Sequence, residues 1–154
     1  MTPRARTNQL LYQAELLLAI APGEDEHAEA RRMAAEEGAL ALLELALESL
    51  VSELTEFTTQ GAAPDWRTLL RSPDLDLAEL ERLRTLIERP DSWLHRLVSR
   101  LGMLHSSDGA ARRSSGAAQG MIAVGGPELA SELLECLDDA KREISALRLT
   151  NEEW

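Results

Sequence analysis

Aromatic side chains make up only 3% of this 154-residue chain, and cysteine occurs once, at Cys136. Strand-favouring aromatic and β-branched residues are scarce, whereas leucine and alanine, which favour helices, dominate the 44% of hydrophobic residues. A lone cysteine excludes an internal disulfide and is typical of a reducing compartment. No apolar run approaches the roughly 20 residues of a membrane-spanning helix. We therefore expect an all-α, cytoplasmic protein in which Cys136 is a buried, unreactive thiol.

The chain also contains few positively charged residues. Sixteen basic residues stand against 27 acidic ones, which gives a formal net charge of −11. The excess lies mainly in two segments, with a net charge of −8 over residues 24–60 and −5 over residues 127–154. Such a balance opposes binding to phosphates or to an anionic bilayer, so we expect neither a nucleic acid nor a membrane as partner. The acidic faces are either a solvated surface or a docking face for a basic partner.

What the chain has in abundance is helical periodicity. The longest pattern runs from about Glu24 to Phe57, and most of its apolar residues recur at spacings that place them on one face of a helix. That face consists of Met33, Leu40, Leu43, Leu47, Leu50, Leu54 and Phe57. Leu42 and Leu45 lie on the opposite side, so this helix needs cover from more than one neighbour. We predict a single-domain bundle of four to five helices around a long central apolar helix.

Capping residues and prolines mark the other elements. Their expected starts, in chain order, are Thr2-Pro3, a short turn at Asp65-Trp66-Arg67, Asp76 with Glu79 as its capping-box partner, Pro90 and Pro127. Residues 106–126, rich in serine, glycine and alanine, are predicted to be a flexible linker in which the apolar tetrad 121–124 docks on the bundle. The predicted organisation is therefore a bundle core over residues 1–105, this linker, and a C-terminal helix over residues 127–154.

The C-terminal helix has the cleanest periodicity, with apolar residues in strict a and d heptad positions. Fewer than three heptads make a poor isolated coiled coil, so this seam packs either on the bundle or against a second copy. In the second case the interface consists of Leu133, Leu137, Ile144 and Leu147. The seam, the acidic faces and the lack of a recognisable catalytic set favour a non-enzymatic protein that acts through protein contacts, as a homodimer or a small adaptor.

Charged side chains continue the stripe of the central helix toward its N-terminus, at Glu29, Arg32 and Glu36. One interpretation is that the stripe frays into solvent, with Arg32 paired to Glu36 at a spacing of four. The other interpretation is a polar pocket at one end of the bundle, because charges that face a core need polar partners. The candidate lining of that pocket is Arg6, Asn8, Gln9, Tyr12 and Glu36.

Two short motifs are the remaining candidates for chemistry. Glu24-x-x-His27 has the spacing of carboxylate-bridged di-iron bundles, but those sites need a second such motif, so we expect no metal and no other cofactor. Arg89 and His95 resemble the arginine–spacer–histidine pattern of the HEPN group of helical ribonucleases, in which the pair handles an RNA 2′-hydroxyl and phosphate. Pro90 departs from that pattern, since the group usually has a polar residue after the arginine. The resemblance implies an alternative function, an RNA- or nucleotide-directed enzyme that uses Arg89 and His95.

A second resemblance covers most of the chain. Arg6-Thr7-Asn8-Gln9 followed by Tyr12, and Ser92-Trp93-Leu94 at the start of a later helix, resemble an uncharacterised family of small all-helical proteins from gammaproteobacteria. The order of features agrees as well, from a short first helix and a long apolar second helix to a low-complexity linker and an acidic last helix. This resemblance implies a bacterial cytoplasmic helical protein and no particular activity.

Overall fold

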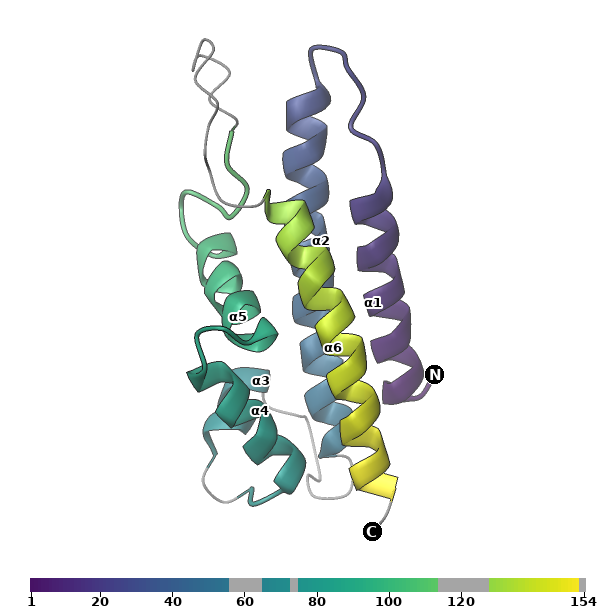
Figure 1. Cartoon of the computed structure of the whole chain (residues 1–154), viewed down its shortest axis with the longest axis vertical. Coiled ribbons are helices and arrows are strands. Elements are labelled where there is room, and N and C mark those ends of the chain that lie inside the picture. Colours follow the sequence, from purple (N-terminus) through teal and green to yellow (C-terminus); the bar gives the residue numbers. More distant parts are fainter. Residues whose placement is uncertain (56–64, 73–74, 114–127, 153–154) are drawn as a thin grey trace.

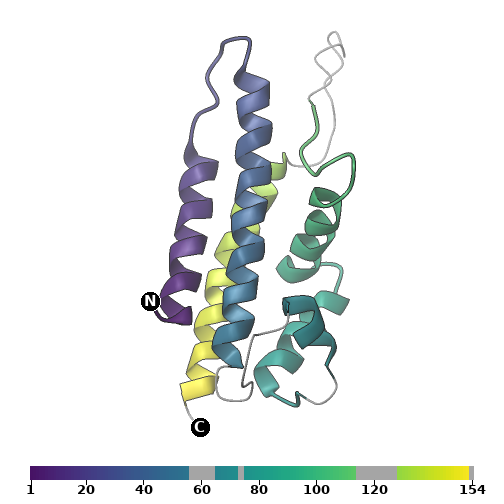
Figure 2. The ribbon, with the colours of Figure 1, turned by 180° about the vertical axis from the view of Figure 1, so that it is seen from behind.

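The computed structural model describes residues 1–55, 65–72, 75–113 and 128–152, and all regular structure in these ranges is helical. The helices are α1 (Pro3–Ala19), α2 (Ala28–Leu54), α3 (Trp66–Arg71), α4 (Ala78–Glu88), α5 (Trp93–Leu104) and α6 (Leu129–Glu152). The long helices α1, α2 and α6 run side by side, and α3, α4 and α5 lie along one side of them (Figures 1 and 2). The all-α, single-domain prediction is confirmed.

Helix α2 contacts each of the other five helices. The middle of its predicted apolar face is buried, from Leu40 to Leu54, whereas Leu42 is half-buried and Leu45 is exposed. Helix α1 packs closely and antiparallel against it. A Cβ atom on Gly38 of α2 would lie 2.9 Å from a methyl group of Leu17, so the absence of a side chain at Gly38 permits this close approach.

The start of α2 differs from the prediction. The helix begins at Ala28, because residues 24–27 form a turn instead of a first helical turn. Gly23 has a φ of +85°, and the Asp25 side chain accepts a hydrogen bond from the backbone N–H of His27 at 2.9 Å. Such local side-chain bonds to the backbone compete with helix formation. At its other end α2 ends at Leu54, and Phe57 lies outside the described residues.

Two of the predicted N-caps are confirmed. The hydroxyl of Thr2 accepts a hydrogen bond from the N–H of Ala5 at 3.1 Å, which caps α1. The carboxylate of Asp65 accepts one from the N–H of Thr68 at 2.8 Å, which caps α3. Trp66, the first residue of α3, is buried as expected.

The predicted starts of α4 and α5 were wrong. Helix α4 begins after Leu77 with no side-chain cap, and Asp76 is exposed. Helix α5 begins at Trp93 and is capped by Ser92, two residues beyond Pro90. A side-chain cap contributes about 1 kcal/mol to the stability of a helix, which is less than the burial of one leucine contributes. The burial of the apolar faces of α4 and α5 therefore sets where these helices begin.

The first part of the predicted linker packs against α2. Ala110 and Ala111 are buried, and their N–H groups donate to the carboxylate of Glu37 at 2.7 and 3.2 Å. Residues 106–113 thus differ from the expected flexible segment. The rest of that segment, including the tetrad 121–124 and the predicted helix start at Pro127, lies outside the described residues.

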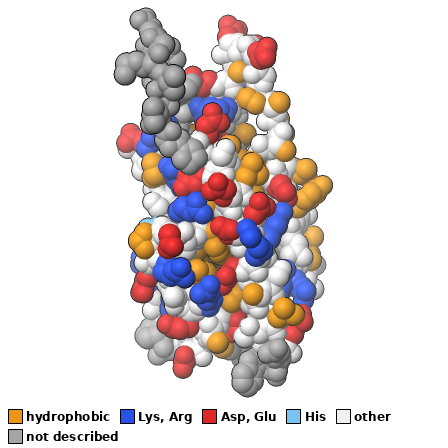
Figure 3. All heavy atoms as spheres, in the orientation of Figure 1, with side chains coloured by type: hydrophobic (Ala, Val, Ile, Leu, Met, Phe, Trp, Pro, Cys, Tyr) orange, Lys and Arg blue, Asp and Glu red, His pale blue; other side chains and the backbone are white. Residues whose placement is uncertain are grey.

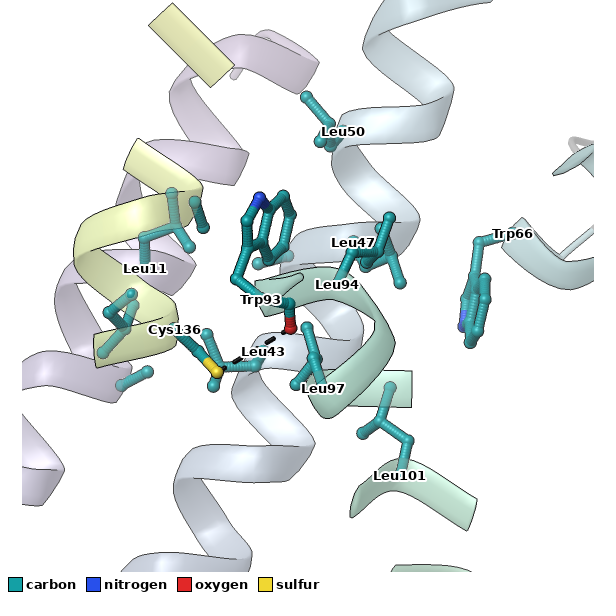
Figure 4. Packing of buried hydrophobic residues seen from close by; sticks show 14 of the residues in the cluster. Leu11, Leu43, Leu47, Leu50, Trp66, Trp93, Leu94, Leu97, Leu101 and Cys136 are labelled. Carbon is teal, nitrogen blue, oxygen red and sulfur yellow. Dashed lines mark hydrogen bonds between the residues drawn. The ribbon is translucent and has the colours of Figure 1, made fainter. Parts of the chain in front are cut away.

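Trp93 occupies the centre of the core. Its indole lies among leucines of α1, α2 and α5 and beside Cys136 of α6 (Figure 4). The indole Nε1 has no hydrogen-bond partner among the described residues. An aliphatic core with two tryptophans, Trp93 and Trp66, is consistent with a composition that is rich in leucine and poor in aromatics.

Candidate functional site

The α6 seam predicted as an interface is buried within the same chain. Its four residues are between 0% and 5% exposed: Leu133, Leu137, Ile144 and Leu147. Ion pairs from α6 to α1, α2 and α5 help to hold it in place: Glu152–Arg4 at 2.8 Å, Lys141–Glu15 at 2.6 Å, Arg148–Glu53 at 2.7 Å and Glu132–Arg100 at 2.5 Å. The seam therefore packs in cis and is not available to a second copy in this fold. A heptad pattern indicates which face of a helix is apolar, but it does not indicate whether the same chain or a second copy covers that face.

The structure does not bring the five residues of the predicted polar pocket together. Four of them lie on α1: Arg6, Asn8, Gln9 and Tyr12. The neighbouring Thr7 bonds to Glu53 near the C-terminal end of α2. Glu36 lies about 25 Å from Glu53 along α2, at 1.5 Å per residue. Because α1 and α2 are antiparallel, the start of α1 faces the end of α2, and Glu36 is remote from it.

Glu36 instead forms a buried pair. It is 1% exposed, and one of its carboxylate oxygens accepts a hydrogen bond from half-buried Arg32. Its other oxygen, Oε2, has no partner among the described residues. Arg32 also donates to the carbonyl of Arg112 at 2.6 Å. The predicted Arg32–Glu36 pair is present. The stripe of the helix does not fray into solvent at this point, because the pair helps to hold residues 106–113 on α2.

Arg89 and His95 have separate structural partners. Arg89 ends α4, and its guanidinium lies 3.7 Å from the carboxylate of Asp91. The Nδ1 atom of His95 lies 2.6 Å from the carbonyl oxygen of Ile87. These contacts close the turn between α4 and α5. Nothing in this geometry directs the two side chains at a common substrate atom, so it lends no support to the ribonuclease-like alternative.

Within the described ranges, no three histidine, cysteine, aspartate or glutamate side chains converge as metal ligands. His27, the histidine of the Glu24-x-x-His27 motif, is exposed and is the last residue of the turn that precedes α2. In the same part of the chain, no helix has the length and apolar character needed to cross a membrane.

Cys136 lies in the core, where its thiol donates to the carbonyl oxygen of Trp93 at 3.7 Å (Figure 4). Burial raises the pKa of this thiol from 9.0 to about 11, against a smaller opposing influence of the Arg96 charge. A nucleophilic cysteine requires a lowered pKa and access to solvent, and Cys136 has neither. The prediction of a buried, inert thiol is consistent with this environment.

We expect Cys136 in the native protein to resist alkylation by iodoacetamide at pH 8 and to react fully after unfolding in urea. Because folding favours the neutral thiol, stability should be unaffected by this group below pH 9.0 and should fall as the pH rises toward about 11. Labelling followed by mass spectrometry checks the first expectation. Equal labelling rates in the native and unfolded protein would contradict it.

Three large apolar side chains are exposed on the outward side of α1 and at its C-terminal end. Tyr12 and Leu16 lie four residues apart on the side of α1 opposite its buried residues, and Ile20, four residues further on, is the C-cap residue with extended backbone angles. They are 60%, 48% and 62% exposed. We call these three residues the α1 outer face. In Figure 3, hydrophobic atoms are visible along the edge of the molecule where α1 lies.

Charges of opposite sign flank the α1 outer face. On one side is Arg6, whose guanidinium bonds to the neutral amide of Gln9 at 2.5 Å. On the other side, the loop after Ile20 carries three exposed acidic residues at 24–26 and continues past the end of α1 (Figure 1). Helix α1 itself contains two arginines and one glutamate, so it lacks the acidic excess of α2 and α6.

A family model described as a family of unknown function, DUF6586, matches residues 1–154. The chain belongs to DUF6586. Because this match spans the chain, the resemblance to an uncharacterised family that the motifs at residues 6–12 and 92–94 indicated is confirmed. No curated protein and no solved structure matched the chain.

In this DUF6586 protein, sequence reasoning missed the α1 outer face as a unit. It singled out Tyr12 for its polar hydroxyl but not Leu16 and Ile20. The available signal was their spacing of four residues, which continues from Tyr12 on the side of α1 opposite the predicted core stripe. Large apolar residues on the polar side of an amphipathic helix remain exposed to solvent in an isolated chain.

Proposed function

We propose that this protein is non-enzymatic and acts through protein contacts, as a homodimer formed by the α1 outer face. The observation that carries the proposal is the exposed row of Tyr12, Leu16 and Ile20 between charges of opposite sign. Apolar rows on a soluble protein are a typical feature of contact surfaces. The dimer replaces the one first predicted at the α6 seam. We place it in the reducing cytoplasm, consistent with the single cysteine.

The charge pattern favours a second copy of this chain as the partner. A two-fold axis at Leu16 sets two α1 helices antiparallel, with Tyr12 of each copy facing Ile20 of the other. The same rotation brings Arg6 of each copy toward the acidic loop at residues 24–26 of the other. The two contacts are equivalent and mutually attractive, which offsets part of the repulsion between two chains that each carry a net charge of −11.

Leu16→Glu should abolish association and leave the fold intact. The substitution puts two like charges together at the two-fold axis, and Leu16 is too exposed for its loss to disturb the core. Sedimentation velocity over a range of concentrations should show the wild-type mass rising from 17.0 kDa toward twice that value. The variant should stay at 17.0 kDa with an unchanged melting temperature. Leu149→Glu, at an exposed leucine of α6, is the matched control and should still dimerise.

A charge exchange tests the antiparallel register. Arg6→Glu should weaken the dimer because it sets like charges against the acidic loop of the partner. Adding Glu26→Arg to that variant should recover part of the lost association, since position 26 lies opposite position 6 in this register and then carries the opposite charge, whereas Glu24 and Asp25 remain acidic. A wild-type protein that remains a monomer at all concentrations would reject the homodimer. Failure of the double variant to recover would reject the register.

A further inference from the structure

A pocket of about 280 Å³ opens between α3, α4 and α5. These three helices lie on the side of the bundle away from α1 (Figures 1 and 2). The pocket is therefore independent of the α1 outer face and of any dimer formed there. We call it the α3–α5 pocket.

The apolar part of the pocket comes from all three helices. The side chains of Leu70 on α3, Ile87 on α4 and Val98 on α5 line it together with the ring of Trp66. Leu70 and Trp66 are buried, whereas Ile87 and Val98 pack on the core and are only half-buried. Such a lining fits a hydrocarbon body and not a free inorganic ion.

The charged part of the pocket is basic. Three arginines and one glutamate, Glu88, line it, in a chain whose net charge is −11. Arg84 donates to backbone carbonyls, at 2.5 Å to Leu70 and 2.9 Å to Ser72, and lies 3.0 Å from the exposed carboxylate of Glu81. Its role is to join α4 to the end of α3, and its charge remains next to the pocket.

The other two arginines are more available. Arg67 stacks over the Trp66 ring, with its guanidinium carbon 4.3 Å from the ring centroid; it lies 3.9 Å from the carboxylate of Glu44 and also interacts electrostatically with Glu48 and Asp65. Arg71 is exposed and has no hydrogen bond or ion pair to the described part of the chain. An unpaired guanidinium at the edge of an apolar pocket matches the geometry of a carboxylate, which it binds through two parallel N–H groups.

We propose that the α3–α5 pocket binds a small carboxylate with a hydrocarbon body. Arg71 and Arg67 receive the carboxylate, and the hydrocarbon lies against Trp66, Ile87 and Val98. The apolar contacts supply binding free energy and the arginines select an anion over a neutral molecule of the same shape. Octanoate is the probe, because its chain is short enough for a pocket of this volume.

Trp66 supplies a direct readout. Its indole Nε1 has no hydrogen-bond partner among the described residues. In a ¹⁵N–¹H spectrum of the full chain, the indole signal that disappears in Trp66→Phe identifies it. Titration with octanoate should shift that signal to saturation, and the signal of Trp93, which lies in the central core, should move less. A shift that rises linearly without saturation, or one that is equal for both indoles, would overturn the proposal.

Three comparisons test the role of the arginines. Arg71→Gln should weaken octanoate binding about tenfold, because a charge-assisted contact is lost. Arg142→Gln, at an exposed arginine of α6 outside the pocket, should leave the affinity unchanged. Octanol, which is neutral, should bind at least tenfold more weakly than octanoate. Equal affinities for octanol and octanoate, or equal losses in the two arginine variants, would show that the pocket does not recognise an anion and would overturn the proposal.

Discussion

Leu137→Asn is expected to lower the free energy of unfolding by about 4–6 kcal/mol. Leu137 lies on the α6 seam and is fully enclosed by its own chain. Asparagine removes the apolar contacts of the leucine and leaves an amide without hydrogen-bond partners in the core. A loss of this size is a large part of the stability of a typical domain, about 5–15 kcal/mol. Urea denaturation followed by circular dichroism measures it.

The matched control is Leu134→Asn, on the same helix but at a position that is 39% exposed. This change should lower the stability by about 1–2 kcal/mol, well below the effect at Leu137, because Leu134 is only partly covered and asparagine is a weaker helix former than leucine. A Leu137→Asn protein that keeps its stability but loses self-association would show that α6 acts in trans. That outcome would also remove the case for a dimer on the α1 outer face.

Arg32→Met is expected to cost about 3–5 kcal/mol, because it leaves the carboxylate of Glu36 buried without its cation. The variant also loses the hydrogen bond from Arg32 to the carbonyl of Arg112, so residues 106–113 should become less protected. Chemical denaturation measures the cost, and amide hydrogen exchange at Ala110 and Ala111 reports the protection. The structural reason for both effects is the same, since Arg32 joins α2 to that segment.

Replacing both members of the pair separates the loss of the ion pair from the loss of side-chain packing. Arg32→Met with Glu36→Leu should recover most of the lost stability, because an apolar pair of similar volume leaves no buried charge behind. Arg31→Met is the control one residue away. Arg31 forms an exposed ion pair with Asp25 and donates to the carbonyl oxygen of Pro22 at 2.9 Å, so its loss should cost less, about 1–2 kcal/mol. A cost this small for Arg32→Met would mean that Glu36 is solvated in the folded protein.

Several elements were predictable because their signals are local. The caps at Thr2 and Asp65 depend on a side chain and a backbone N–H three residues away, so the sequence contains all the atoms involved. The start of α2 was predicted four residues too early, although its cause is also local. The acidic residues at 24–26 fit either the first turn of a helix or the turn seen in the structure. The choice depends on Arg31, which bonds to the side chain of Asp25 and to the carbonyl oxygen of Pro22.

The candidate sites were less predictable because each joins residues that are distant in the sequence. Glu37 meets Ala110, and Arg67 and Arg84 come to one pocket from different helices. The polar pocket failed for a related reason. Periodicity gives the face on which Glu36 lies, but the antiparallel direction of α1 places Leu17 beside Gly38 and Thr7 beside Glu53, so the start of α1 is remote from Glu36.

The sequence by itself determined that this protein is helical, where most of its helices lie and which of their faces are apolar. These properties follow from propensity and from a period of 3.6 residues, which act within one segment. Only the tertiary structure decided what covers each face. The α6 seam is closed by its own bundle, whereas Tyr12, Leu16 and Ile20 have no cover within the described chain sufficient to bury them. Both rows of residues are apolar in sequence. They differ in burial, because the packing of all the helices together determines which apolar faces are covered.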